Sequence, residues 1–230
     1  MIGLPRVHHR ATDSTNERAK QLALGGAPHG TLVTADEQSA GRGRQGRVWS
    51  AEPGHAVLMS LIVRGLSKGD ALLPLVAAVA VCEACEGTAA VTCRIKWPND
   101  VWIDGRKVCG ILVEGRPQEG WAVLGIGVNV STPSFPGELA ETATSLALAG
   151  KAPSRDAVLE ALLASLERWL AADSAAILAA WRERDTLLGA PVSWNEGRGK
   201  GAGITDSGAL RVETDAGIVE MDAGEVHLKR

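Results

Sequence analysis

One short segment of the chain combines three arginines with three glycines. It reads SAGRGRQGRVWS over residues 39–50, and we call it the Arg–Gly loop. Glycine allows a close backbone approach, and a guanidinium binds carboxylates and phosphates through paired hydrogen bonds. Arginines this close together repel one another in the absence of an anion. The segment therefore predicts a loop that wraps a nucleotide phosphate, a carboxylate or a nucleic acid, against the alternative of a plain solvated turn.

A second group of polar residues surrounds a tight turn. Lys96, Asn99, Asp100 and Lys107 lie in the segment KWPNDVWIDGRK, whose Asp-Gly pair is a strong hairpin signal. Each residue alone has an ordinary explanation, because Asn and Asp favour turns and lysines are usually solvated. Together they place two amines beside a carboxylate and an amide, which favours a second part of one anion site.

Glycines also interrupt two strands that are otherwise apolar. Gly110 follows Lys107 by three residues, and Gly125 and Gly127 lie in the next predicted strand, just before Asn129. A glycine inside a strand often marks the close approach of a ligand. These positions extend the predicted site across neighbouring strands.

Two familiar nucleotide motifs do not fit the Arg–Gly loop. Gly41, Gly43 and Gly46 have the spacing of the dinucleotide fingerprint, but no helix pattern starts at Gly46, and that fingerprint requires one. The chain also lacks the G-x-x-x-x-G-K-[ST] phosphate loop. An RNA-binding module that uses the arginines is the alternative from a different class of function.

The bulk composition limits the class of protein. The chain has 230 residues, 45% of them hydrophobic, and a formal net charge of −3, which gives no general attraction to nucleic acid. The apolar run at 71–82 is too short to span a bilayer, and the first residues lack the apolar centre of a signal peptide. We therefore expect a cytoplasmic protein with no membrane partner and no nucleic-acid partner.

Four cysteines are present, at positions 82, 85, 93 and 109. Cys82 and Cys85 form a C-x-x-C pair, but both lie on one face of an alanine- and valine-rich helix pattern. A second pair at zinc spacing is absent. We expect small buried core residues here, and no zinc site.

The periodicity predicts a mixture of helices and strands. A helix starts at Ser14, whose spacing to Glu17 fits a capping box, and only about 30 residues precede the first strand. A buried helix is expected at 71–86 and a polar, mobile loop at 131–145. The other expected elements are strands at 31–38, 56–64, 94–97, 101–103, 107–114 and 121–130, and helices at about 154–172 and 174–185.

The pattern changes from Gly189 onward. Short strands alternate with Gly, Asp and Ser turns, which predicts a small β-barrel of about five strands. Residues 186–230 carry five basic and seven acidic side chains, so a nucleic-acid-binding module is not expected there. We expect two domains, residues 1–186 and residues 187–230.

Four motifs, in order, resemble the biotin protein ligases. They are DSTN at 13–16, EQSAGRGRQGRVW at 37–49, KWPNDVWIDGRKVCGILVE at 96–114 and GIGVNV at 125–130. With the C-terminal strands, the resemblance spans nearly the whole chain. It implies an α+β fold, in which residues 1–186 form a mixed, mainly antiparallel sheet with helices and residues 187–230 form an SH3-like β-barrel.

The resemblance also implies a two-step reaction. Biotin's carboxylate attacks the α-phosphorus of MgATP, which gives biotinyl-5′-AMP and pyrophosphate. A lysine of a biotin carboxyl carrier protein then attacks this mixed anhydride. Both substrates of the first step are anionic, so the reaction needs positive charge, alignment and exclusion of water more than a protein nucleophile.

The family's functional residues carry over to the matching positions. The resemblance implies that Lys107, Arg44 and Arg42 are catalytic, that Lys107 bridges biotin's carboxylate and the α-phosphate, and that Asp100 binds Mg²⁺. The residues implied to bind biotin are Ser14, Thr15, Asn16, Gln38, Gly41, Arg42, Arg44, Trp49, Lys107, Gly110 and Gly125. Those implied to bind ATP are Arg44, Arg47, Lys96, Asn99, Asp100, Lys107, Asn129 and Lys229.

The chain departs from some members of the family. One helix before the first strand leaves no room for the helix-turn-helix of members that repress genes, so we expect a ligase without DNA binding, as a monomer or homodimer. The loop 131–145 carries no tryptophan for the adenine, and Lys229 stands where the family's final strand can offer an arginine. A lipoate-type ligase is the nearest alternative, but its R-R-x-S-G-G-G loop is absent.

Overall fold

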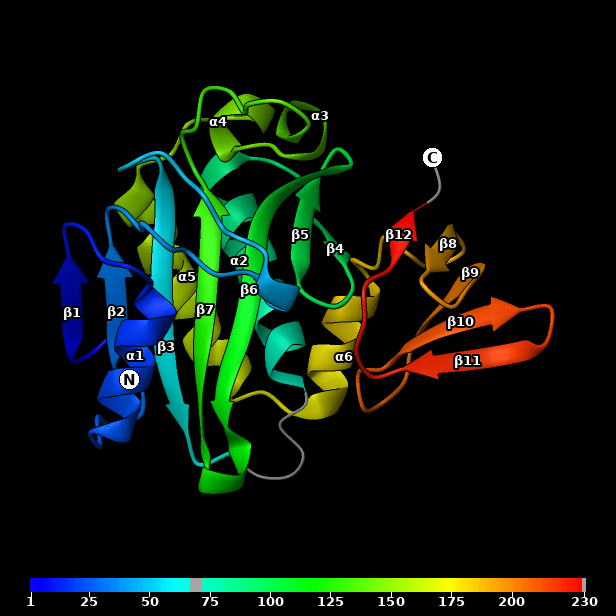
Figure 1. Ribbon diagram of the computed structural model, residues 1–230, viewed down its shortest axis with the longest axis horizontal. Coiled ribbons are helices and arrows are strands. Elements are labelled where there is room, and N and C mark those ends of the chain that lie inside the picture. Colours follow the sequence, from blue (N-terminus) through cyan, green and yellow to red (C-terminus); the bar gives the residue numbers. More distant parts are fainter. Residues whose placement is uncertain (67–71, 229–230) are drawn as a thin grey trace.

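A seven-stranded sheet forms the centre of the molecule (Figure 1). The computed structural model describes residues 1–66 and 72–228. The strand order is β1-β2-β3-β7-β6-β5-β4, in which β1 and β2 are parallel and the other neighbours antiparallel. The strands are β1 Arg6–His9, β2 Leu32–Ala35, β3 Ala56–Arg64, β4 Arg94–Lys96, β5 Asp100–Ile103, β6 Arg106–Arg116 and β7 Trp121–Asn129. The expected mixed, mainly antiparallel sheet is confirmed.

The central strands β3 and β7 are buried on both faces. Their sequences are almost continuously apolar, and Arg64 is the one residue of the two strands that is not fully buried. Helix α1 (Thr15–Leu24) covers one face, where Ala19 and Ala23 pack on the sheet. Helices α2 (Leu73–Ala89) and α5 (Arg155–Leu170) cover the other face (Figure 1). The site residues therefore lie on a rigid, two-sided core.

The helices follow the expected pattern closely. In α2, Pro74 lies in the first turn, where its missing N–H costs no helical hydrogen bond; residue 71, where this helix was expected to begin, lies outside the described residues. Ser154 caps α5, and Asp173 caps α6 (Ser174–Arg182), each by accepting a backbone N–H. The loop 131–145 contains one short helix, α3 (Leu139–Thr142), and α4 (Leu146–Ala149) follows it.

Two expectations about the N-terminal segment are wrong. The first strand is β1 at Arg6–His9, not the strand after residue 30, because its short RVHH run pairs with β2 at the sheet edge and carries no long apolar signal. Ser14 is the N-cap residue of α1 as expected, but no capping box forms. The Asp13 carboxylate accepts the Ser14 N–H at 2.6 Å, while Glu17 pairs with Lys20 at 2.7 Å.

The C-terminal segment forms a separate antiparallel sheet of five strands beside α6 (Figure 1). Trp97 ties it to the central sheet, since its indole N–H donates to the buried carbonyl of Gly208 at 3.0 Å. Thr186 pairs with Ile95 of β4 at the junction, where the Thr186 N–H donates to the Ile95 carbonyl at 3.0 Å. The strand order is β11-β10-β9-β8-β12, with β8 Pro191–Trp194, β9 Gly197–Ile204, β10 Leu210–Thr214, β11 Gly217–Met221 and β12 His227–Leu228.

All four cysteines are buried, as the sequence predicted. Within residues 1–66 and 72–228, no helix is both long and apolar enough to cross a membrane. The predicted nucleotide contact Lys229 lies outside the described residues.

Candidate active site

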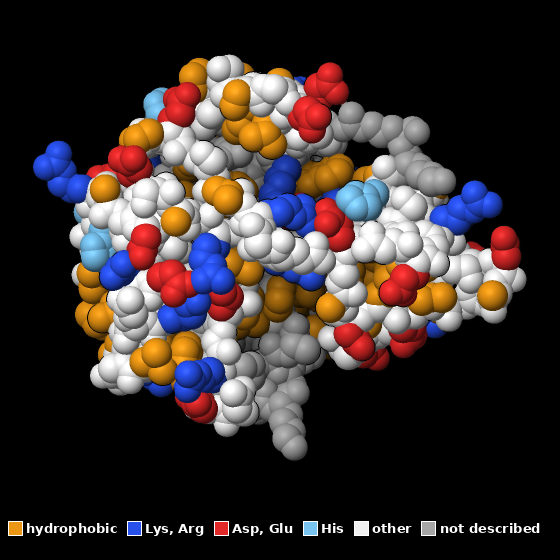
Figure 2. All heavy atoms as spheres, viewed as in Figure 1, with side chains coloured by type: hydrophobic (Ala, Val, Ile, Leu, Met, Phe, Trp, Pro, Cys, Tyr) orange, Lys and Arg blue, Asp and Glu red, His pale blue; other side chains and the backbone are white. Residues whose placement is uncertain are grey.

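A pocket of about 860 Å³ opens between the central sheet and the C-terminal sheet. Its walls come from the start of α1, the Arg–Gly loop, the β4–β5 turn, strands β6 and β7, the loop 131–145 and the segment Gly224–Leu228. Figure 2 shows basic side chains gathered in the hollow between the two parts of the molecule. The two polar groups singled out in the sequence, about 50 residues apart, thus line one cavity.

The Arg–Gly loop is a narrow hairpin closed by its own backbone. Trp49 N–H donates to the Gly41 carbonyl at 3.0 Å, and Gly43 N–H donates to the Arg47 carbonyl at 2.7 Å. A side chain at Gly41 would place its Cβ 2.2 Å from the Trp49 carbonyl, so this position requires glycine. At the tip, Gln45 has φ of 54°, a strained value for a residue that is not glycine.

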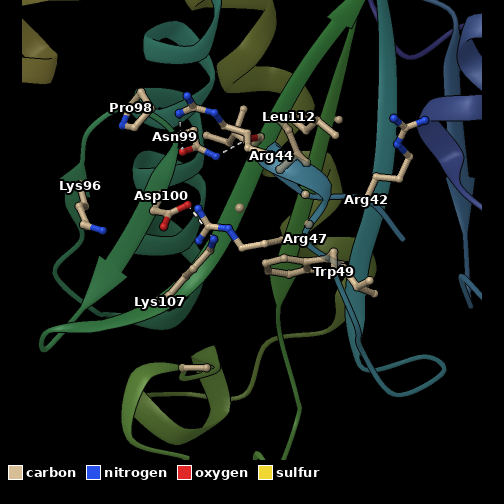
Figure 3. Close-up of a pocket in the computed structure, with 18 of the residues that line it drawn as sticks. Arg42, Arg44, Arg47, Trp49, Lys96, Pro98, Asn99, Asp100, Lys107 and Leu112 are labelled. Atoms are coloured by element: carbon tan, nitrogen blue, oxygen red, sulfur yellow. Dashed lines mark hydrogen bonds and ion pairs between the residues drawn. The ribbon is translucent and has the colours of Figure 1, made fainter. Parts of the chain in front are cut away.

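Arg44 and Arg47 turn from this hairpin toward the pocket (Figure 3). The Arg44 guanidinium donates to Asn99 Oδ1 at 3.2 Å and to the Gly224 carbonyl at 3.3 Å. Burial lowers the pKa of Arg44, which marks a guanidinium held partly out of water. Arg47 forms an ion pair with Glu225 at 2.7 Å. The C-terminal segment therefore contributes Gly224 and Glu225 to the pocket, whereas only Lys229 of this segment was expected from the sequence.

Arg42 points away from these two arginines (Figure 3). It forms ion pairs with Glu17 of α1 and with Glu114 of β6, the latter at 3.1 Å. Its place among the catalytic and biotin-binding residues stays a prediction, because its side chain is engaged with carboxylates of the protein.

The β4–β6 segment brings two lysines to the pocket. Lys107 Nζ lies 2.7 Å from an Asp100 carboxylate oxygen and 5.7 Å from the centre of the Trp49 ring. Lys96 lies 5.3 Å from the Trp102 ring, and burial lowers the pKa of its ammonium group. With Arg42, Arg44 and Arg47, five basic side chains line the pocket and two carboxylates, Asp100 and Glu225, oppose them, so the pocket has an excess of positive charge.

The strand glycines make room for side chains of the protein itself. A Cβ at Gly127 would lie 2.5 Å from the Trp49 ring, and a Cβ at Gly110 would lie 2.9 Å from it. The indole of Trp49 therefore lies flat on β6 and β7. Its buried Nε1 faces Gly127 of β7 and has no hydrogen-bond partner among the described residues.

The other end of the pocket carries a network of uncharged polar groups. The Thr15 N–H and hydroxyl both approach Gln38 Oε1, at 2.7 and 2.9 Å. Ser60, buried in β3, lies 2.8 Å from the Thr15 hydroxyl and 2.6 Å from Asn16 Oδ1. Gly125 is needed here because a Cβ would lie 2.1 Å from Asn16 Oδ1.

Sequence reasoning missed Ser60, although it is the one polar residue in the otherwise apolar run AVLMSLIV. It also missed Phe135, the single phenylalanine of the chain, which lines the pocket from the loop 131–145. A lone polar residue in a buried strand was the available signal for Ser60; loop packing is not visible in a sequence.

Ser14 and Asn129 are both almost fully buried and line the pocket. The Ser14 hydroxyl makes no capping bond to α1, so it is not used by the helix. Asn129 donates from Nδ2 to the Thr144 carbonyl at 3.0 Å, and Thr144 N–H donates to the Lys107 carbonyl at 2.9 Å. Asn129 thus fastens the end of the loop 131–145 beside Lys107. A nucleotide contact of Asn129 stays a prediction.

Comparison with known proteins defines the class of this chain. Residues 9–131 match the biotin/lipoate A/B protein ligase family, and residues 196–229 match the biotin protein ligase C terminal domain. A biotin–[acetyl-CoA-carboxylase] ligase of Paracoccus denitrificans is 36% identical over 94% of this chain and 97% of its own length. The bifunctional ligase/repressor BirA of Bacillus subtilis is 37% identical over 99% of this chain and 75% of its own length.

The chain therefore belongs to the biotin/lipoate A/B protein ligase family. Its fold is similar to that of a biotin protein ligase from Aquifex aeolicus in complex with biotin and ATP, with a TM-score of 0.86, 31% identity, and 98% of each chain covered. Within the family, the chain is a biotin protein ligase, as its four motifs indicated.

Proposed function

We propose that this chain activates biotin with ATP to biotinyl-5′-AMP and transfers the biotinyl group to a lysine of a biotin carboxyl carrier domain. One observation carries the proposal. A single pocket has an uncharged polar end at Thr15, Asn16 and Gln38 and a cationic end with four basic side chains. This polarity suits a ligand whose head is a neutral ring with N–H and C=O groups and whose tail is a carboxylate beside a triphosphate.

In this proposal the polar end orients biotin's ureido ring. Ser14, Thr15 and Gln38 provide hydroxyl and amide groups for its N–H and C=O. Trp49 forms the apolar wall beside Gly110. These contacts hold the carboxylate still at the other end of the pocket, which reduces the entropic part of the barrier.

Lys107 is the proposed catalytic cation. Biotin's carboxylate oxygen attacks the α-phosphorus, the new O–P bond forms, and pyrophosphate leaves with the electrons of the broken P–O bond. Negative charge develops on the α-phosphate oxygens, and the Lys107 ammonium, now 2.7 Å from Asp100, stabilises it. Arg44, Arg47 and Lys96 bind the phosphates that carry the remaining charge.

Magnesium bound to ATP usually needs only one or two protein carboxylates, because the phosphates supply other ligands. Asp100 lines the cationic end of the pocket and fits this requirement. In residues 1–66 and 72–228, no group of three acidic, His or Cys side chains is suited to a metal. We propose that Asp100 would hold the Mg²⁺ that arrives with ATP. The metal ion would supply positive charge to the triphosphate.

The carrier domain and the two-domain division belong to the same proposal. Residues 1–186 would bind biotin and ATP, and residues 187–230 would close one wall of the pocket through Gly224 and Glu225. The second step would bring a carrier lysine to the adenylate through the open side of the pocket, where its amine attacks the acyl carbon and AMP leaves.

Exchange of labelled pyrophosphate into ATP tests the proposal. Purified protein with Mg²⁺ is given biotin, lipoate or neither. Exchange that requires biotin is the expected result, because adenylation is reversible and needs no carrier. Exchange with lipoate alone would keep the fold and overturn the substrate, and no exchange in a folded sample would overturn adenylation altogether.

A further inference from the structure

A compact charged cluster connects the base of the Arg–Gly loop to the sheet. Arg42 pairs with Glu17 and, at 3.1 Å, with Glu114, and Lys20 pairs with the same two carboxylates at 2.7 and 3.5 Å. Two cations and two carboxylates balance one another. The Glu114 and Lys20 side chains are each 21% exposed and Arg42 is 46% exposed, so the Glu114 end of the cluster is the part best shielded from water.

Glu114 also reaches the polar end of the pocket. Its second carboxylate oxygen accepts the Asn16 side-chain N–H at 3.0 Å. Asn16 Oδ1 in turn accepts from Ser60, and Ser60 contacts Thr15, which binds Gln38. A continuous chain of polar contacts therefore runs from the proposed ureido subsite through Glu114 to Arg42.

We propose that Glu114 is a positioning residue, which acts through Arg42 and Asn16 to hold the Arg–Gly loop closed while the polar end of the pocket is occupied. Neither Glu114 nor the guanidinium of Arg42 touches the substrates in this proposal. The inference rests on the proposed adenylation. It adds that occupation of the polar end of the pocket controls closure of the Arg–Gly loop at the cationic end.

The geometry separates the roles of neighbouring arginines. Arg44 and Arg47 face the pocket, whereas Arg42 faces α1 (Figure 3). The tip of the loop can therefore bind phosphate while the base is held by carboxylates of the protein. A bound ligand that orders Thr15 and Asn16 also orders Glu114, which stabilises the closed loop.

A double-mutant cycle tests the proposal. The variants are Arg42→Gln, Glu114→Gln and the pair, and the readouts are the rate at which biotinyl-AMP leaves the enzyme and the KM for biotin in the exchange assay. Each single variant should release the adenylate about fivefold faster, and the double variant no faster than the worse single one. Arg42→Lys should restore part of the retention, since it keeps one ion pair.

The matched control is Glu119→Gln. Glu119 pairs with Arg116 at 2.8 Å in the hairpin that follows β6, outside the pocket lining. Glu119→Gln should leave adenylate release unchanged. Melting temperatures of all variants identify general loss of stability, which would lower the active fraction without changing the release rate.

Two results would overturn the positioning role. One is wild-type adenylate release in Glu114→Gln. The other is a double variant whose effect is the product of the single effects, because Arg42 would then act on the substrate directly. Protease sensitivity of residues 39–50 in biotin-bound protein, compared between wild type and Glu114→Gln, gives a readout that does not depend on adenylation. If the loop is equally sensitive in both proteins, this inference fails. Because the measurement needs no adenylation, that result is distinct from failure of the proposed activity.

Discussion

At the scale of single residues, the shape of the pocket depends on the side chains that pack against its glycines. Gly127 and Gly110 accept the Trp49 indole, and Gly125 accepts Asn16. The sequence identified these glycines as places of close approach, and the structure shows that the approaching groups are side chains of the protein. Trp49 and Asn16 therefore form part of the pocket wall, and the glycines lie behind them.

The first residue-scale prediction concerns charge stabilisation. Lys107→Ala should slow biotin-dependent pyrophosphate exchange by about 100-fold, because it removes the cation nearest the proposed reacting phosphate. Lys151→Ala, an exposed lysine outside the pocket lining, serves as the control and should keep wild-type exchange. Wild-type exchange in folded Lys107→Ala would contradict the catalytic role.

The second concerns packing at Gly125. Gly125→Ala should lower the free energy of unfolding by about 1–3 kcal/mol, because the new methyl group overlaps the buried Asn16. Gly87→Ala is the matched control: its Cβ enters open space on an exposed helical position and should raise stability by about 0.5–1 kcal/mol. Urea unfolding of both variants measures the difference. If Gly125→Ala were as stable as wild type, Asn16 would move aside for the new methyl group at no cost.

At the scale of elements, helix α1 starts with a set of contacts different from the one its sequence suggested. The capping-box spacing is present, but the Asp13 carboxylate accepts the Ser14 N–H, and Glu17 forms ion pairs with Arg42 and Lys20. The Ser14 hydroxyl is consequently left for the pocket. The helix start lines the pocket, and Asp13, which accepts the Ser14 N–H, also pairs with Arg18.

Serine substitutions at two helix starts test this difference. Ser154→Ala should cost about 1 kcal/mol of stability, because Ser154 caps α5 by accepting the Ala157 N–H at 3.1 Å. Ser14→Ala should change stability by less than about 0.5 kcal/mol and raise the KM for biotin. Chemical denaturation and exchange kinetics on both variants measure these effects. A loss of stability in Ser14→Ala equal to that in Ser154→Ala would restore the capping role.

The pH dependence of stability should report on Asp13. Hydrogen bonds from Arg18, and one from the Ser14 N–H, hold the pKa of this carboxyl well below its ordinary value. A pKa that is lowered in the folded state gives stability above the unfolded pKa of about 4 and loses it as the pH falls further. Asp13→Asn should thus lower the melting temperature at neutral pH, and the difference from wild type should shrink below about pH 4.

The control for this prediction is Asp215→Asn, at an exposed turn between β10 and β11. It should show no such convergence with wild type. If the difference between Asp13→Asn and wild type stays constant across the same pH range, the contribution of Asp13 is not electrostatic.

At the scale of the whole molecule, the pocket exists because two sheets meet. Arg44 and Arg47 of the Arg–Gly loop contact Gly224 and Glu225 of the C-terminal segment. Trp97, next to the pocket residue Lys96, bonds to Gly208 of the C-terminal part. The position of the cations therefore depends on how the C-terminal sheet is docked.

Trp97→Phe tests this docking. It keeps most of the ring but leaves the buried Gly208 carbonyl without its donor, which should cost about 1–3 kcal/mol. Trp121→Phe is the control, because the Trp121 indole bonds to Glu119, whose carboxylate reaches water. Urea unfolding of both variants is measured with and without biotin. It gives the loss of folding stability and the loss of stabilisation by a ligand in the pocket. Equal losses in the two variants would mean that the Gly208 bond contributes nothing special to docking.

The sequence by itself determined most of the elements and the expectation of an anion site. Apolar runs such as AVLMSLIVR and the Asp104-Gly105 turn specify strands and a hairpin through local preferences. The spacing of arginines and lysines was enough to predict an anion site, because few other arrangements tolerate so much like charge. These signals act over a few residues, and a sequence displays them directly.

Only the tertiary structure decided which neighbour each polar group takes. Arg42 and Arg44 are two residues apart, yet one pairs with Glu114 and the other with Asn99. Strand β1 forms because β2 offers a free edge, and Glu225 enters the site because the C-terminal sheet docks there. Hydrogen bonds and ion pairs between residues far apart in sequence depend on the relative placement of whole elements, and local sequence patterns carry no information about that placement.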